Sequence, residues 1–418
     1  MGGFGQPKPV TEHATEDTDG DAPTRREYLT YGGAVVAGGL LAGCAGDERS
    51  TPAADPTATD AATPTATGTA TATGTPTADD AYAVEMAPVG EVTFESVPET
   101  WIPYGGDYAD MAVALGRGDG IAGIGGGDRY YTRVYDELPG VSVDREPIES
   151  HPEVRTKEQF HELDADVHLY DPRMLINWFD WDRSDVEEVA ANVAPFVGNL
   201  IFRREDRWHD YRYYSLYEAF ETVARVFRRE ERYRALKDLH DEFVADVRAR
   251  MPPASERPDV LLTFEGTTEP ETFSPYRLDD RGTSEKQWRD FGVADALAGT
   301  GVDGLSTTDR GELDYESLLA VDPDVLLVRG HERRTAREFR DTVLAYMEDH
   351  PVGGELAAVR NGRVYRGGYL YQGPIHNLFL TERAAKQLYP DTFGEVTSDE
   401  RLFDRGRVAD IVAGDGRS

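Results

Sequence analysis

Residues 215–251 read SLYEAFETVARVFRREERYRALKDLHDEFVADVRARM, and their apolar side chains recur at the spacing of one helix face. Neither Gly nor Pro occurs in this stretch, whereas Pro252 and Pro253 follow it and stop a helix because proline lacks a backbone N–H. The pattern therefore predicts one continuous helix over residues 216–251. At about 1.5 Å per residue it would span roughly 50 Å, enough to connect two small domains. A long helix inside one ordinary domain is the alternative at this point.

The chain carries a large excess of acidic residues. Its 418 residues include 44 Lys and Arg against 78 Asp and Glu, so the formal net charge is 44 − 78 = −34. This balance argues against nucleic acid and anionic lipid as partners. Only five of the 44 basic residues are lysine, a pattern similar to that of proteins from extreme halophiles, with a generic acidic protein as the alternative. The length predicts two or three domains.

The first 44 residues are predicted to be an export signal. Arg25 and Arg26 precede a short apolar run, 32–41, that is too short for a permanent membrane anchor and resembles a twin-arginine signal. Cys44, the only cysteine of the chain, follows the small residues of a lipoprotein cleavage site and cannot form an internal disulfide. We therefore expect lipid on Cys44 to anchor the protein to the extracytoplasmic face of the cell membrane.

Composition divides the rest of the chain into five parts. Residues 45–83 are rich in Thr, Ala and Pro and are predicted to form a disordered tether. Residues 84–214 and 253–394 alternate short apolar strands with helices, which predicts an α/β lobe on each side of the linker helix at 215–252. The tail, 395–418, gives no clear prediction.

Within the lobes, individual strands and helices can be expected from apolar runs and from helix start and stop signals. Strands are predicted at 121–124, 167–170, 260–264, 325–328 and 363–365, and helices at 185–194, 292–297, 336–347 and 374–388. Gly118, Gly120 and Gly123 fit the dinucleotide pattern G-x-G-x-x-G, but they lead into a strand instead of leaving one. That fingerprint requires glycines between a strand and a helix, so we do not predict a nucleotide site.

A weak internal repeat indicates two equivalent lobes. Residues 158–170 align without gaps to residues 316–328, and each copy begins with a Glu, continues through an acidic turn and ends in a strand. Glu158 and Glu316 occupy the matching first positions. As surface carboxylates at helix starts they are also favoured by the helix dipole.

This repeat is one of several features in which the chain resembles the substrate-binding proteins of ABC importers, in the class that takes up ferric siderophores, haem or cobalamin. The similarity covers roughly 92–394. It is carried by Asp-Pro-Asp-Val at 322–325, Ser-Leu-Tyr-Glu-Ala at 215–219, Gly-Pro-Ile at 373–375 and Leu-Tyr-Pro at 388–390. In the first lobe, Ala165 stands where the family pattern has proline.

The resemblance implies two Rossmann-like α/β lobes with mainly parallel sheets, joined by one long α-helix, and a ligand cleft between them. It also implies a monomer that does no chemistry on its ligand and needs no cofactor, because iron arrives as part of the chelate. Glu158 and Glu316 match the glutamates that meet arginines of the membrane permease in that family. Capping of their own helices is the alternative role.

The residues that follow each predicted strand are the candidate ligand contacts, because ligands of open parallel sheets lie beyond the carboxyl ends of the strands. Arg and Tyr gather there; Arg suits carboxylate or catecholate oxygens, and Tyr offers flat apolar area with a polar tip. The predicted contacts are Tyr130, Tyr131, Arg133, Tyr170, Arg173, Tyr276, Arg277, Arg329, His331, Tyr369 and Tyr371.

The sequence thus predicts an extracytoplasmic lipoprotein that captures a ferric chelate, most readily a siderophore, and delivers it to an ABC permease. Haem or a corrinoid remains an alternative ligand. No catalytic or metal-site motif is present, and the nine histidines lack zinc-site spacing. The other hypotheses are a carrier of free Zn²⁺ or Mn²⁺ that uses His331 and His376, a secreted α/β enzyme, and a structural surface lipoprotein.

Overall fold

The computed structural model describes residues 81–204, 206–300, 311–397 and 399–414, all within one compact unit, residues 65–418. The predicted signal, with Arg25, Arg26 and Cys44, lies outside the described residues, as does nearly all of the predicted tether. Strand β1 (Tyr82–Met86) takes in the last two residues of the predicted tether, 82 and 83. Across the described ranges, no helix is both long and apolar enough to span a membrane.

The first lobe is built on a short parallel sheet. Strands β3 (Trp101–Pro103) and β4 (Val167–Leu169) pair in parallel, and single bridges to Ile121 and Phe196 extend the sheet on both sides. The predicted strand at 121–124 is therefore reduced to one bridge. After Ile121 the backbone divides its hydrogen bonds between β3 and residues 151–154, so no regular ladder forms.

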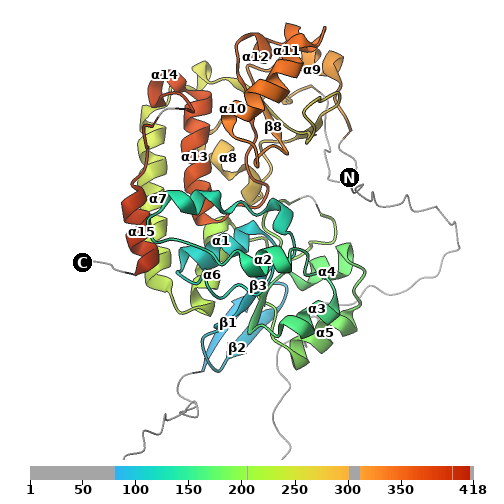
Figure 1. The fold of residues 1–418 in the computed structure, drawn as a ribbon, viewed down its shortest axis with the longest axis vertical. Helices are drawn as coiled ribbons and strands as arrows, with labels where there is room; N and C mark the ends of the chain where they lie inside the picture. The colour runs from blue at the N-terminus through green and yellow to red at the C-terminus, as the bar shows by residue number, and fades with distance from the viewer. Residues whose placement is uncertain (1–80, 205, 301–310, 398, 415–418) are drawn as a thin grey trace, which may run out of the picture. The chain divides into compact units, whose positions relative to one another are not determined.

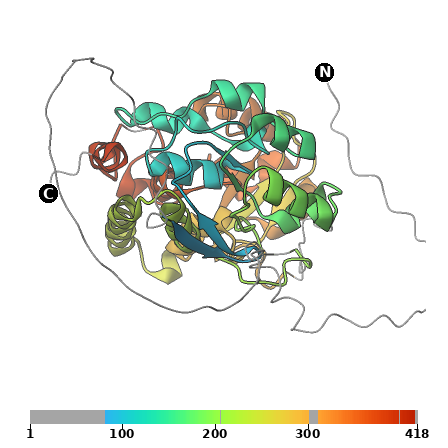
Figure 2. The same cartoon turned by 90° about the horizontal axis from the view of Figure 1, so that it is seen from below.

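The other first-lobe elements surround this sheet (Figures 1 and 2). β1 forms an antiparallel hairpin with β2 (Gly90–Phe94). The helices are α1 (Gly106–Ala114), α2 (Glu146–Ser150), α3 (Lys157–Leu163), α4 (Pro172–Trp178) and α5 (Arg183–Asn192), with short turns η2 (Gly127–Arg129) and η3 (Thr132–Glu137). The predicted helix at 185–194 is confirmed as α5, shifted by two residues.

The single helix predicted over residues 216–251 is wrong, because the chain forms two helices, α6 (Leu216–Val226) and α7 (Glu230–Arg250). Arg228 adopts the left-handed conformation with φ 50°. The N–H groups of Arg228 and Arg229 donate to the carbonyls of Arg225 and Ala224, which is the Schellman arrangement that ends a helix. Glycine usually occupies this position, so the sequence offered no stop signal.

The two helices pack against each other as an antiparallel pair (Figures 1 and 2). Phe220 of α6 lies against Tyr233 of α7 with ring centroids 5.4 Å apart, and Tyr217 lies 4.7 Å from His240. α6 contacts α1 and β1 and belongs to the first lobe, and both α6 and α7 contact α13 (Pro374–Leu388). α7 is therefore the helix that carries the chain from the first lobe to the second.

The second lobe has a larger sheet with the order β6-β5-β8-β9, in which β7 also pairs with β5. β5 (Asp259–Phe264), β7 (Ala294–Asp295), β8 (Val325–Arg329) and β9 (Val364–Arg366) are parallel, and β6 (Ser274–Tyr276) is antiparallel. The predicted strands at 260–264, 325–328 and 363–365 are confirmed. The predicted helix at 292–297 is wrong, because Gly292 (φ 55°) ends α8 (Lys286–Phe291) and β7 follows at once.

The remaining helices cover this sheet and α7. They are α9 (Tyr315–Val321), α10 (Ala336–Phe339), α11 (Ala345–Asp349), α12 (Ala357–Arg360), α13, α14 (Pro390–Phe393) and α15 (Arg405–Ala413), with the turns η4 (Ala254–Glu256), η5 (Thr283–Glu285) and η7 (Gly353–Glu355). A π-helical stretch, η6 (Arg340–Leu344), joins α10 to α11, which accounts for the one helix predicted at 336–347. α13 has the predicted bounds, and α15 packs on α7.

The internal repeat has a structural counterpart. Asp164 ends α3 and Asp322 ends α9, each in the left-handed conformation with φ 44°. Two residues later, the carboxylates of Asp166 and Asp324 accept hydrogen bonds from backbone N–H groups at the start of the neighbouring strand. Ala165 replaces the proline of the second copy without changing this turn. The predicted fold class is confirmed: two α/β lobes with mainly parallel sheets.

Candidate ligand-binding cleft

A cavity of about 330 Å³ lies between the two lobes, near the carboxyl ends of their strands. The first lobe contributes Tyr104, Arg129, Tyr131, Trp178, Phe202 and Arg203, and the second contributes Phe264, Tyr276, Arg329, Gly330, Gly368, Leu370 and Tyr371. The lining is thus dominated by aromatic rings and contains three arginines. This is the composition expected of a pocket that combines apolar area with a few orienting polar groups.

The aromatic rings hold one another in place across the two lobes. Tyr371 lies 5.7 Å from Tyr104, the residue after β3, and 4.6 Å from Phe202, measured between ring centroids. Trp178, at the end of α4, packs 6.2 Å from Tyr104. Phe264, the last residue of β5, keeps 39% of its surface exposed. The cleft therefore presents rigid apolar faces that are already ordered without a ligand.

Arg329, the last residue of β8, is largely committed to the protein itself. Its side chain is 2% exposed and lies 2.8 Å from Glu285, which is equally buried. Its Nη2 donates to the carbonyl of Ser284 at 2.7 Å, while its Nε has no hydrogen-bond partner among the described residues. The guanidinium also stands 4.8 Å from the ring of Tyr276. Arg329 therefore forms part of the cleft wall, and its Nε–H is the only guanidinium atom group left available to a ligand among the contacts described.

The other two arginines of the lining differ in how closely a carboxylate pairs with each guanidinium. Arg203 forms a bidentate pair with Asp206, at 2.6 and 2.7 Å, and stacks 4.7 Å above Trp178. Arg129 is 46% exposed at the side chain, and its one ion pair among the described residues is a loose contact with Asp128, at 3.7 Å. Arg129 is accordingly the cation of the cleft best placed to meet ligand oxygens.

Four of the eleven predicted contacts line the cavity: Tyr131, Tyr276, Arg329 and Tyr371. Tyr369 lies just behind them and stacks on Tyr131 at 4.6 Å.

The other six predicted contacts lie away from the cavity. The Tyr130 hydroxyl meets that of Tyr135, and the Tyr170 hydroxyl donates to the carbonyl of Val154. Arg133 donates to the carbonyl of Arg333, and the guanidinium of Arg173 lies over the ring of Tyr211. Arg277 forms an ion pair with Asp295, and the ring of His331 contacts the guanidinium of Arg334. Tyr130 and Tyr131 lie in extended chain, where consecutive side chains point to opposite sides, and of the two only Tyr131 lines the cavity.

Nine lining residues were not among the predicted contacts: Tyr104, Arg129, Trp178, Phe202, Arg203, Phe264, Gly330, Gly368 and Leu370. Phe264 and Gly330 lie at or just after predicted strands, and Arg129, Gly368 and Leu370 lie three to five residues beyond them. The rule that ligand contacts follow strand ends could have found all five. Tyr104 follows β3, which was not predicted. Trp178 and Phe202 come from a helix end and a loop, where no sequence signal marks them.

A buried carboxylate from the first lobe caps a helix of the second beside this cleft. Asp110 of α1 accepts hydrogen bonds from the backbone N–H groups of Ile375 and His376, at 2.8 and 3.0 Å, in the first turn of α13. Tyr135 donates its hydroxyl to the same carboxylate at 2.7 Å. Backbone bonds from Thr283 and Ser284 to residues 201–202 join the lobes a second time. The two lobes are thus connected by directed hydrogen bonds as well as by α7.

Comparison with known proteins decides the family. The family described as periplasmic binding protein matches residues 103–369, more than half of the chain. The chain belongs to the periplasmic binding protein family. No curated protein matches it.

Solved structures show the same fold for this periplasmic binding protein. Petrobactin-binding protein YclQ from Bacillus subtilis has 17% identity and a TM-score of 0.50, over 74% of this chain and 99% of that one. CeuE from Helicobacter pylori with Ni(II) bound has 14% identity and a TM-score of 0.50, over 75% and 90%. A periplasmic solute binding protein from Veillonella parvula has 14% identity and a TM-score of 0.50, over 77% and 89%.

The glutamates of the repeat lie exposed on equivalent helices of this binding protein. Glu158 stands in the first turn of α3, where Thr156 and Gln159 form the capping box, and Glu316 stands in the first turn of α9, which Asp314 caps. Other side chains supply the capping hydrogen bonds of both helices, while the helix dipole favours the two glutamates as first-turn carboxylates. No group of three or more His, Cys, Asp or Glu side chains in the described part of the chain is arranged to hold a metal ion.

We expect the stability of the protein to depend on pH through Asp107, at the start of α1. Burial raises the pKa of this carboxyl from 3.8 to about 7, although the N–H of Tyr108 opposes the change. The stabilising contribution of the protonated form is complete below pH 3.8 and is lost as the pH rises toward 7. Asp107→Asn, which cannot ionise, should therefore exceed the wild type in unfolding free energy by roughly 2–4 kcal/mol at pH 8 and by almost nothing at pH 4. Calorimetric melts at both pH values test this, and a difference that is the same at both would contradict it.

Proposed function

We propose that the protein is a monomeric extracytoplasmic lipoprotein that captures a ferric chelate and delivers it to the permease of an ABC importer. A siderophore is the first choice of ligand, with haem or a corrinoid as the alternative. The observation that carries the proposal is the cleft between the lobes, where aromatic rings surround the exposed Arg129. Similarity in fold to a petrobactin-binding protein supports the same class of function.

The cleft suits a ligand that brings its own metal. Rings such as Tyr104, Trp178 and Tyr371 give flat contact area, while Arg129 can meet carboxylate or catecholate oxygens of a chelate with two N–H groups. In this mechanism the protein binds and orients the chelate, and the chelator's own oxygens coordinate the iron. Lipid on Cys44, exported through the signal at Arg25 and Arg26, would keep the protein close to the permease.

Release would need only a small movement of the lobes. α7 is a stiff connection of 21 residues, and the Asp110 cap and the bonds between residues 283–284 and 201–202 hold the lobes together beside the cleft. We therefore propose that the permease opens the cleft by separating these contacts, without a wide hinge motion.

Calorimetric titration of the full chain tests the proposed ligand class. The panel contains ferric hydroxamate, catecholate and carboxylate siderophores, haem, cobalamin, Zn²⁺ and Mn²⁺, all in concentrated salt. We expect saturable binding of a ferric siderophore that Arg129→Ala weakens at least ~10-fold, about 1.4 kcal/mol. Arg337→Ala is the matched control, because that arginine is exposed on α10. Tight binding of a bare divalent ion, with no response to any chelate, would refute the proposal.

The proposed permease contact is tested separately. Glu158→Arg with Glu316→Arg should abolish uptake of the chelate by cells or vesicles that contain the importer, because each change replaces an attraction to permease arginines by repulsion. Affinity for the chelate, measured on the purified protein, should stay within about twofold of the wild type because both positions are exposed and lie on helices outside the cleft lining. Glu162→Arg with Leu319→Arg, exposed changes on the same two helices, is the control for surface charge and should leave uptake largely intact. Uptake at the wild-type rate in the Glu158 and Glu316 variant would show that these residues do not dock the permease.

A further inference from the structure

A second cavity, of about 420 Å³, lies beside α7 and is formed by three parts of the chain. The start of α6, one face of α7 and residues 281–290 line it, and we call it the α7 cavity. Residues 283–290 also support the ligand cleft, because Glu285 and the carbonyl of Ser284 hold Arg329. The two cavities therefore share this short segment, yet no residue lines both.

The α7 cavity collects positive charge in a protein whose net charge is −34. Its lining contains five cations, Lys237, Arg248, Arg281, Lys286 and Arg289, against two carboxylates, Asp241 and Asp290. Two of the five lysines of the whole chain are therefore in this one cavity. Burial lowers the pKa of His240 to about 4, so its ring adds no charge near neutral pH.

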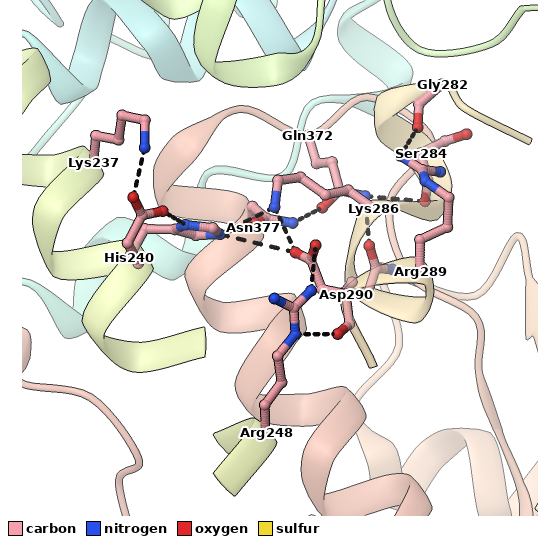
Figure 3. Close-up of polar contacts among 12 residues, drawn as sticks. Lys237, His240, Arg248, Gly282, Ser284, Lys286, Arg289, Asp290, Gln372 and Asn377 are labelled. Atoms are coloured by element: carbon pink, nitrogen blue, oxygen red, sulfur yellow. Dashed lines mark hydrogen bonds and ion pairs between the residues drawn. The ribbon is translucent and has the colours of Figure 1, made fainter. Parts of the chain in front are cut away.

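Both carboxylates are already occupied by neighbouring cations (Figure 3). Lys237 pairs with Asp241 at 2.5 Å, whereas Lys286 and Arg248 share Asp290 at 2.5 and 3.4 Å.

Two cations remain without a carboxylate. Arg289 donates to the carbonyls of Asp280 and Gly282, and Arg281 is exposed. Neither forms an ion pair with a carboxylate in the part of the chain that the structure describes. Within the lining the cations outnumber the carboxylates, and a bound anion would reduce this excess; outside the lining, Glu285 and Asp280 also attract Arg289.

A neutral group of the lining independently points to a ligand. Thr283 is 3% exposed, and its hydroxyl has no hydrogen-bond partner among the described residues. A buried hydroxyl without a partner costs about 1–3 kcal/mol, so such groups usually find one. An acceptor oxygen inside the cavity would satisfy it.

We propose that the α7 cavity binds a multivalent oxyanion of the phosphate class. The guanidinium groups of Arg281 and Arg289 offer paired N–H donors that match two oxygens of such an anion, and Lys286 adds a point charge. The hydroxyl of Thr283 supplies a neutral donor.

The site is held in place before any anion arrives. Lys286 contacts His240 at 3.1 Å, and His240 contacts Asn377 at 3.1 Å (Figure 3). Asn377 donates to Gln372 at 2.8 Å, which donates in turn to the carbonyl of Ser284 at 3.0 Å. This network runs from the α7 cavity to the carbonyl that holds Arg329, so Lys286 is fixed by polar contacts with buried side chains.

Calorimetric titration of the full chain with inorganic phosphate and then pyrophosphate, in concentrated NaCl at constant ionic strength, tests the proposal. We expect saturable binding of one anion per chain, tighter for pyrophosphate. Arg281→Glu should weaken it at least tenfold. Arg337→Glu makes the same charge change on an exposed arginine far along the chain and should leave it unchanged. Absence of saturable heat from both anions, or equal effects of the two variants, would overturn the proposal.

Thr283→Val separates a ligand contact from a structural role. If the hydroxyl serves the anion, the variant should lose several-fold in pyrophosphate affinity while its melting temperature in the absence of anion stays the same or rises. Unchanged affinity together with a higher melting temperature would mean that the hydroxyl is only an unpaired group, and would overturn its assignment to the site. Ferric-chelate binding by both variants is measured in parallel, so failure of this inference is distinct from failure of the proposed function.

Discussion

Replacing Arg329 with alanine is expected to lower the free energy of unfolding by about 3–5 kcal/mol. The change leaves the carboxylate of Glu285, 2% exposed, buried without its ion-pair partner, and removes the donor to the Ser284 carbonyl. Burial already raises the pKa of Glu285, and Arg329 is the main group that opposes this rise. Urea unfolding of the wild type and the variant at neutral pH measures the difference.

The double variant Arg329→Met with Glu285→Gln is the control for this prediction. It removes both charges and keeps similar volumes, so it should recover most of the lost stability. A loss below about 1 kcal/mol in Arg329→Ala would show that the pair is not buried as described. Because the fold depends on this arginine, loss of ligand by Arg329→Ala alone would not establish a ligand contact.

Replacing Asp110 with alanine is the second change with a large expected effect. It leaves two backbone N–H groups of α13 and the hydroxyl of Tyr135 without their acceptor in a fully buried site. Hydrogen bonds to a charged group contribute about 1.5–3 kcal/mol each and are not additive, so we expect a loss of at least ~3 kcal/mol in unfolding free energy. Thermal and urea unfolding both measure it.

Asp110→Asn is the matched variant, because it keeps an acceptor oxygen of the same size and should lose clearly less stability than Asp110→Ala. Equal losses in the two variants would indicate that the side-chain oxygen does not cap α13. Because the cap links the two lobes, Asp110→Ala should also increase hydrogen exchange at the first turn of α13 more than in the centre of that helix.

Helix boundaries could be predicted where the sequence carries local start or stop signals. Gly373 and Pro374 mark the start of α13, and the predicted bounds of that helix are those of the structure. The end of α6 carries no such signal. Arg228 takes the left-handed conformation that usually falls to glycine, while its guanidinium lies 4.4 Å from the ring of Tyr82. Tyr82 also donates its hydroxyl to the carbonyl of Val226. These long-range contacts with β1 end the helix, and apolar periodicity cannot reveal them.

The cleft could be predicted only in part for a related reason. The rule that ligands lie beyond the carboxyl ends of parallel strands leads to Tyr131 and Tyr371. Tyr276 ends the antiparallel strand β6, to which that rule does not apply. The rule cannot say which of two consecutive residues faces the cleft, nor that Arg329 is neutralised by Glu285 from 44 residues away. Trp178 and Phe202 reach the cavity through packing on Tyr104 and Tyr371, which depends on the assembled lobes.

Quenching of Trp178 fluorescence is the most direct measurement of the central claim that the cleft binds a ferric chelate. Trp178 is the only one of the five tryptophans in the cleft lining, and a ferric chelate bound there would quench it. We predict saturable quenching of the full chain by a ferric siderophore, the greater part of which is lost in Trp178→Phe although calorimetry still detects binding. Quenching that is the same in Trp178→Phe, or no quenching by any ferric chelate of the panel, would contradict this account.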